Sequence, residues 1–169
     1  VLVYDDAGDH TALQAAEIIA KAGGKVEYMT ADRTLAPEVM AMNLVPYMRT
    51  LQMLDAAFTP GFRLTGIKRD NNELVASISS DYTQVAKERR VDQVVVNFGT
   101  LPMEDLYQEL KPLSSNQGAV NYDNLIIGKP QPLPTNIEGT FQLFRIGDAI
   151  SHRNTHAAIY DALRIVKDL

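Results

Sequence analysis

The chain opens with Val1-Leu2-Val3-Tyr4-Asp5-Asp6, and this stretch decides the fold together with the residues that follow it. An apolar run that ends in two aspartates is typical of a buried strand. Residues 11–21 then place apolar side chains at helical spacing, with Asp9 or Thr11 as the helix N-cap. Residues 26–30 have the pattern of a second strand. Strand, tight turn, helix and strand predict the βαβ unit that opens a nucleotide-binding α/β domain.

The middle of the chain changes from a helical to an alternating pattern. Residues 37–56 have the spacing of one long helix, which Pro46 should kink or split. Between residues 62 and 89, short alternating runs are separated by turn signals such as Asp70-Asn71-Asn72. This arrangement predicts an antiparallel β-meander. Residues 91–97 contain consecutive valines and predict a further buried strand.

The C-terminal part has weaker patterns. Residues 103–110 predict a short helix. Residues 114–139 are rich in Asn, Gly, Pro and Ser and predict a connector, with one short extended piece at 122–127. Residues 140–146 predict the last strand, and residues 153–167 predict the last helix.

The composition excludes several functions. The chain has 169 residues and a formal net charge of −5, which argues against a surface for nucleic acid. It has no cysteine, so it offers no thiolate for a disulfide, a zinc–thiolate site or an iron–sulfur cluster. No apolar run reaches the roughly 18 residues of a membrane helix, and no secretory signal is visible. We expect a cytoplasmic protein without membrane contact and, because Val1 already belongs to a strand, a fragment of a longer one.

The order of these elements resembles that of flavoproteins of the glutathione-reductase type. Four motifs sharpen this resemblance: Val1–Asp6, Glu17–Gly23, Gly99-Thr100-Leu101-Pro102 with Leu106-Tyr107, and the tail from Ile146-Gly147-Asp148 to Leu163-Arg164. Together they resemble the C-terminal NAD/FAD-binding-type region of NADH:flavin oxidoreductases, the family of trimethylamine dehydrogenase and 2,4-dienoyl-CoA reductase. Within that family, they most resemble the N-methyl-amino-acid demethylases that act on dimethylglycine or N-methylproline.

The resemblance implies an α/β fold, a Rossmann-like three-layer domain with an inserted antiparallel β-meander. Residues 1–113 would form the NAD(P)-binding-type domain, 114–139 a connector, and 140–169 a strand and helix that complete a flavin- or ADP-binding domain. A TIM barrel with FMN, a 4Fe-4S cluster and the first half of the flavin domain would lie upstream. The parent would be an oxidoreductase acting on N-methylated amines or enones, with an electron-transfer flavoprotein as a possible partner. The fragment alone should be inactive, and we identify no catalytic residue in it.

The first candidate site is the turn after the first strand. Residues 7–12 fill the positions of a G-x-G-x-x-G fingerprint, with Gly8 inside the turn. Asp9 stands where the second glycine would admit a pyrophosphate, and Asp5 and Asp6 add negative charge. NAD(P)H binding is therefore doubtful, and Asp9 can be read simply as a helix cap. Gly99, after the strand at 91–97, is a further cofactor-binding candidate.

The second candidate site is the Gly147-Asp148-Ala149 turn. The resemblance implies that Asp148 binds a ribose or ribityl hydroxyl of FAD or ADP, and that N–H groups at the following helix start meet the pyrophosphate. Asp148 could instead cap that helix. Arg153 could meet a phosphate, or pair with Asp148 or Asp161.

Other interpretations of the sequence remain open. His152 and His156 have zinc-like spacing, but no third ligand is evident, so we predict no metal site. A phospho-receiver domain would use Asp5-Asp6, Asp55 and Lys111-Pro112 as its acidic pocket and lysine. A working NAD(P)H-binding domain and a non-catalytic docking module are the further alternatives.

Overall fold

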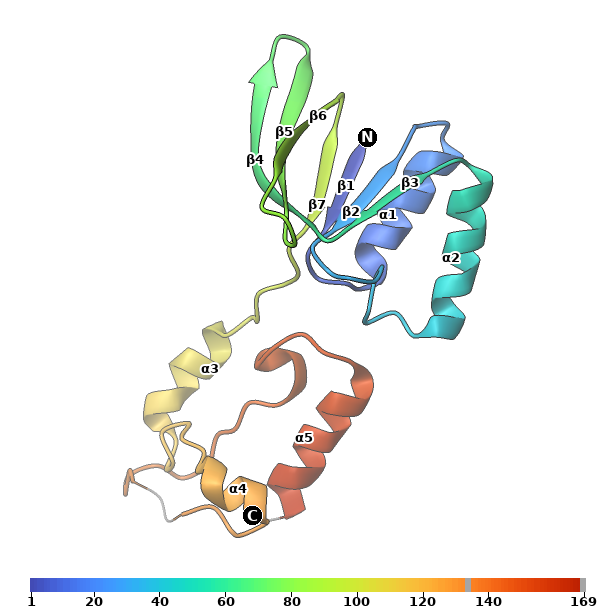
Figure 1. The fold of residues 1–169 in the computed structure, drawn as a ribbon. Coiled ribbons are helices and arrows are strands. Elements are labelled where there is room, and N and C mark those ends of the chain that lie inside the picture. The colour runs from blue at the N-terminus through green and yellow to red at the C-terminus, as the bar shows by residue number, and fades with distance from the viewer. Residues whose placement is uncertain (133–134, 168–169) are drawn as a thin grey trace. The chain divides into compact units, whose positions relative to one another are not determined.

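The computed structural model describes residues 1–132 and 135–167. Residues 133–134 of the predicted connector and residues 168–169 of the predicted last segment lie outside the described residues. The chain divides into two compact units, Val1–Gly99 (unit 1) and Thr100–Leu169 (unit 2) (Figure 1). The predicted assignment of residues 1–113 to one domain of the parent protein, and of residues 140–169 to another, stays a prediction.

Unit 1 is built on a four-stranded parallel sheet. Its strands are β1 (Leu2–Asp5), β2 (Glu27–Thr30), β3 (Ala57–Pro60) and β7 (Val94–Asn97), in the order β3-β2-β1-β7. The register pairs Asp5 with Thr30 on one side and with Asn97 on the other. The last residues of three strands therefore lie side by side at one edge of the sheet.

Two helices cover one face of this sheet. They are α1 (His10–Lys21) and α2 (Ala41–Met53), which pack on Val3 and Tyr28 (Figure 1). The predicted helix over 37–56 is wrong at its start, and α2 runs through Pro46 without a break. Pro46 lies on an exposed part of α2, where solvent is available to the carbonyl group that loses its hydrogen bond.

The meander covers the other face. It consists of β4 (Phe62–Asp70), β5 (Glu73–Ser80) and β6 (Ala86–Val91), all antiparallel as predicted. The alternate residues of the parallel strands, Leu2, Tyr4 and Met29, pack against Ala76 and Ile78 of β5. Helices, parallel sheet and meander form three layers, which confirms the predicted α/β fold class.

The described part of unit 2 consists of helices and 3₁₀ turns. They are α3 (Asp105–Leu110), the 3₁₀ turn η1 (Lys111–Leu113), α4 (Tyr122–Ile127), the 3₁₀ turn η2 (Gly147–Ala149) and α5 (Thr155–Lys167). The extended piece predicted at 122–127 is wrong, because local capping favours a helix there. The side chain of Asn121 accepts a hydrogen bond from the Asn124 N–H, and Gly128 ends the helix at φ +66°.

The strand predicted at 140–146 is also absent from the described residues. An extended segment needs a neighbouring strand to pair its backbone, and unit 2 has none in the part described. The backbone instead bonds to buried polar residues. The Ser115 N–H donates to the Phe141 carbonyl at 2.7 Å, and the Asn116 side chain bonds both the N–H and the carbonyl of Leu143. No helix in the described part is long and apolar enough to cross a membrane.

Candidate functional site

The turn after β1 is organised around the buried carboxylate of Asp5. Its Oδ1 accepts hydrogen bonds from the N–H groups of Ala7 and Gly8, at 3.3 and 3.1 Å, and from Asn97 Nδ2 at 3.0 Å. Its Oδ2 accepts a short hydrogen bond from the Tyr28 hydroxyl. Burial and the neighbouring Asp5 raise the pKa of the Tyr28 phenol, which keeps this group a donor. Asp5 therefore fixes the shape of the turn.

Asp9, one of the two residues predicted as the N-cap, caps α1. Its Oδ1 accepts from the Thr11 N–H at 2.8 Å. The same oxygen accepts from Asn97 Nδ2 at 2.9 Å, so one amide group joins Asp9 to Asp5. Asn97 Oδ1 accepts from the N–H of Gly99 at 3.2 Å. The predicted residues around the turn are thus brought together by Asn97, which the sequence did not single out.

Gly8 is required at its position by geometry. Its φ is +71°, and a Cβ at this residue would lie 2.7 Å from Cδ of Pro37. The Glu38 N–H donates to the Gly8 carbonyl at 3.0 Å. The segment after β2 therefore packs directly on the turn where a dinucleotide fold would receive its ligand.

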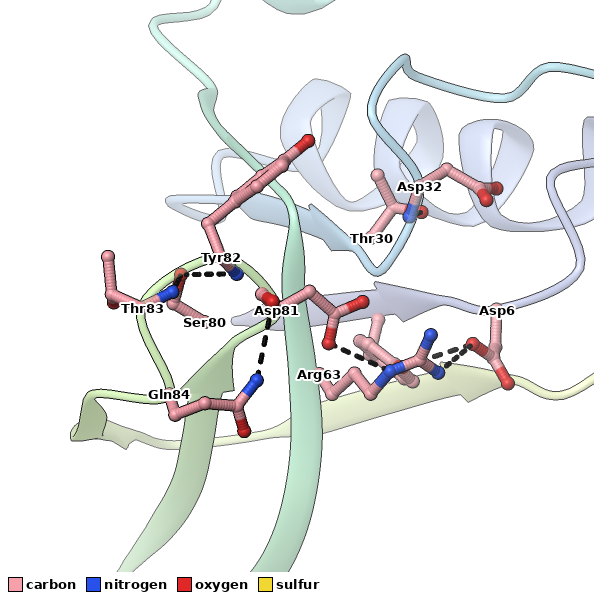
Figure 2. A network of polar contacts seen from close by, with 10 residues as sticks. Asp6, Thr30, Asp32, Arg63, Ser80, Asp81, Tyr82, Thr83 and Gln84 are labelled. Carbon is pink, nitrogen blue, oxygen red and sulfur yellow. Dashed lines mark hydrogen bonds and ion pairs between the residues drawn. The ribbon is translucent and has the colours of Figure 1, made fainter.

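The charges around the turn are mainly negative (Figure 2). Arg63 of the meander bonds Asp81 through Nε at 2.9 Å, while its Nη1 lies 3.8 Å from Asp6 Oδ1. Burial, followed by the charges of Asp5 and Asp6, raises the pKa of Asp32. The position of Asp32, two residues past β2, was also missed. In a dinucleotide-binding fold an acidic residue at this place binds ribose hydroxyls.

The Gly147 turn of unit 2 differs from its prediction. Gly147 has φ +56°, and a Cβ there would lie 2.9 Å from Cβ of Ala158. The helix α5 starts only at Thr155, so Asp148 caps no helix and the expected strand–turn–helix is interrupted. The Asp148 side chain is 70% exposed, and its Oδ1 accepts weakly from the Arg153 N–H at 3.5 Å. Its carboxylate is therefore open to an external donor.

Arg153 pairs with Asp161, one of the predicted alternatives. The Asp161 Oδ2 accepts from the Arg153 guanidinium and from the Gly147 N–H, the latter at 3.1 Å. Although burial acts to raise it, the pKa of Asp161 is lowered overall by the hydrogen bonds from Arg153 and Gly147. The N–H of Gly147, the first residue of the turn, therefore donates to a carboxylate of α5, a contact for which no local sequence pattern exists.

A cavity of about 600 Å³ lies beside this turn in unit 2. Its wall combines three arginines with aromatic and aliphatic side chains: Arg145, Arg153, Arg164, Tyr107, Tyr122 and Ile150. Arg145 bonds Glu104, and Arg164 donates to the Leu125 carbonyl at 2.7 Å. Such a wall suits a ligand that has both an anionic and a flat apolar part.

The remaining predicted sites fare differently. His152 precedes α5, so it does not share a helical face with His156. Among the described residues, no group of three or more metal-ligating side chains comes together. Asp55 lies just before β3, at the opposite edge of the sheet from Asp5 and Asp6. The acidic pocket of a receiver domain is therefore not formed.

Comparisons with known proteins agree with the motifs. The “Probable N-methylproline demethylase” of Rhizobium meliloti (strain 1021) is 62% identical over 169 residues, which are 100% of this chain and 25% of that protein. The “N,N-dimethylglycine/sarcosine dehydrogenase” of Chromohalobacter salexigens is 40% identical over 172 residues, covering 99% of this chain and 25% of that protein. The chain thus spans about a quarter of the length of these curated relatives. No family model matches it.

The fold also has a solved counterpart. Histamine dehydrogenase from Rhizobium sp. 4-9 superimposes with a TM-score of 0.66 at 19% identity, over 99% of this chain and 22% of that one. At this identity the match shows the fold alone. The sequence comparisons confirm the predicted resemblance of this chain to a region of N-methyl-amino-acid demethylases, and the superposition agrees with the predicted fold.

Proposed function

We propose that this chain is part of a flavin-dependent oxidoreductase that demethylates N-methylated amines. The observation that carries the proposal is the 62% identity, over the whole chain, to a protein named as an N-methylproline demethylase. The second relative is named for dimethylglycine and sarcosine, which are also N-methylated amino acids. Flavin, when bound, supplies the acceptor for the hydride that oxidation of an N-methyl group removes. Hydrolysis of the resulting iminium yields the demethylated amine and formaldehyde.

We further propose that unit 2 contributes to a site for FAD or ADP. Four residues would take part: Gly147, Asp148, Ala149 and Arg153. The exposed carboxylate of Asp148 is a strong acceptor for a ribose or ribityl hydroxyl. The arginines that line the adjoining cavity supply positive charge for phosphate groups. The donor and acceptor set therefore fits an adenine nucleotide.

The other redox groups are assigned to the rest of the parent protein. A chain without cysteine cannot ligate a 4Fe-4S cluster through thiolates, so we place the cluster, the FMN and the TIM barrel in the upstream part. An electron-transfer flavoprotein is the proposed acceptor of the electrons. Both assignments follow from the family resemblance.

The function is tested with the intact parent protein. We expect N-methylproline or N,N-dimethylglycine to reduce its flavin and to release formaldehyde and the demethylated amino acid in equal amounts. Proline and glycine, which have no N-methyl group, serve as matched controls and should give neither product. Reduction of an enone without any amine oxidation would contradict the proposal.

The nucleotide site is tested in the same preparation. We expect Asp148→Ala to lower the affinity for the adenine nucleotide roughly tenfold, through loss of one charge-assisted hydrogen bond. Asp105→Ala, which removes an exposed aspartate from α3, is the control. The protein is dialysed and then denatured, and the nucleotide that denaturation releases is quantified by chromatography. Equal nucleotide loss in both variants would exclude a role for Asp148.

A further inference from the structure

The turn after β1 has the topology of a dinucleotide site. It joins a parallel strand to the N-terminus of a helix, where free N–H groups and the helix dipole would attract a pyrophosphate. Such a turn works when glycine at the second position lets the phosphates approach the backbone. In this chain the second position is Asp9.

The backbone donors of the turn are already used by the protein's own carboxylates. The Thr11 N–H, in the first turn of α1, donates to Asp9 at 2.8 Å. The N–H groups of Ala7 and Gly8 donate to Asp5. A pyrophosphate would have to replace these acceptors before it could bind.

The Asp9 side chain is also held in place. Asn97 Nδ2 donates to Asp9 at 2.9 Å and to Asp5 at 3.0 Å, from the end of the neighbouring strand β7. Rotation of Asp9 away from the turn would break its hydrogen bonds to both Thr11 and Asn97. The position of the carboxylate is therefore fixed from two directions.

The local charge acts in the same direction. Asp5, Asp6, Asp9 and Asp32 bring four carboxylates to this edge of the sheet, and Arg63, the cation that contacts Asp6, is also bonded to Asp81. A ligand with two negative phosphates would be repelled.

We infer that Asp9, held by Asn97, occupies the pyrophosphate position of unit 1 and thereby excludes nicotinamide dinucleotides from this turn. Asp9 is thus a specificity-determining residue, and unit 1 has the fold of an NAD-binding domain but does not bind NAD at this turn. This inference goes beyond the proposed demethylase activity and does not depend on it, because it concerns binding at one turn rather than turnover.

The test uses the intact parent protein with NAD⁺, which cannot reduce a bound flavin. Hydrogen exchange of peptides covering residues 5–16 reports binding at this turn specifically. We expect no protection in the wild type at millimolar NAD⁺. Asp9→Gly, which keeps an acceptable helix cap, should gain protection and at least a roughly tenfold higher affinity for NAD⁺.

Two controls make the result specific. Asp55→Gly removes the same charge at the opposite edge of the sheet, from a residue with φ +55°, and should gain nothing. NADP⁺ should gain less than NAD⁺ in Asp9→Gly, because Asp32 would repel a 2′-phosphate. Protection of residues 5–16 by NAD⁺ in the wild type would overturn the inference, whether or not the variant folds. An equal gain in Asp9→Gly and Asp55→Gly would also overturn it.

Discussion

At the turn after β1 the carboxylate of Asp5 is buried, whereas at the Gly147 turn the aspartate of the Gly-Asp pair faces solvent. Asp5 is 0% exposed and accepts hydrogen bonds from four groups of the protein. The Asp148 side chain is 70% exposed, and its contacts with Arg153 and His152 are long, at 3.5 and 3.7 Å. Glycine and aspartate are common to both turns. The number of protein donors around each carboxylate decides whether it anchors the fold or remains available to a ligand.

The largest effect on stability should come from removing the buried carboxylate of Asp5. Asp5→Ala removes the acceptor of the Ala7 and Gly8 N–H groups and of the buried Tyr28 hydroxyl, while Asn97 Nδ2 keeps its hydrogen bond to Asp9. We expect unit 1 to lose roughly 2–4 kcal/mol of its free energy of unfolding. Hydrogen exchange of the amides of β1 and β2 measures this loss.

The matched control is Asp6→Ala, one residue along the chain. Asp6 is exposed; its Oδ1 lies 3.8 Å from Arg63 Nη1 and accepts from the Tyr4 hydroxyl at 3.2 Å. We expect a loss of about 1 kcal/mol from this variant, because one hydrogen bond and one long ion pair are removed. Similar losses in both variants would mean that burial does not distinguish the two carboxylates.

A second, smaller effect concerns the backbone of the outward-facing turn. Gly147→Ala combines a positive φ with a Cβ placed 2.9 Å from Cβ of Ala158, and should destabilise unit 2 by roughly 1–3 kcal/mol. Gly128→Ala has a similar φ of +66° but no atom within 4 Å, and should cost only about 1 kcal/mol. Hydrogen exchange in α5 and α4 measures the two effects. The contact with α5 contributes nothing if the two costs are equal.

The smallest effect is the dependence of stability on pH, which differs between Asp161 and Asp32. The pKa of Asp161 is lowered, so its carboxylate stabilises the fold above its ordinary pKa, and this contribution is lost as the pH falls through the folded-state value. The pKa of Asp32 is raised, so its charged form destabilises the fold, and stability is lost as the pH rises through the folded-state value. The two turns should therefore respond to pH in opposite directions.

Substitution by asparagine isolates each contribution. At pH 7, Asp161→Asn should lower the free energy of unfolding by about 0.5 kcal/mol, and Asp32→Asn should raise it by a similar amount. Both differences should shrink below pH 4, as followed by urea unfolding at a series of pH values. Differences of the same sign, or differences that persist in acid, would refute the opposed roles.

Much of the fold follows from local sequence patterns. Strands β1, β2 and β7, helix α1 and the meander coincide closely with their predicted ranges. In β1, β2, β5 and α1 the reason is a set of buried apolar side chains at the spacing of the element. Strand β3 was missed, since Ala57–Pro60 is short and only partly buried, which leaves no alternation to detect. The segment 140–146 failed for the opposite reason, because its extended pattern has no neighbouring strand among the described residues of unit 2.

By itself, the sequence determined that Asp9 or Thr11 caps α1, and the structure selects Asp9, whose carboxylate accepts from the Thr11 N–H two residues along the chain. It also determined the demethylase resemblance. Only the tertiary structure decided the role of that cap. Asn97 is 92 residues from Asp5, and it bonds the carboxylates of both Asp5 and Asp9 because parallel strands end at one edge of the sheet. Asp161 reaches Gly147 because α5 folds back on the turn. Contacts between distant residues depend on how the elements pack, which no local pattern contains.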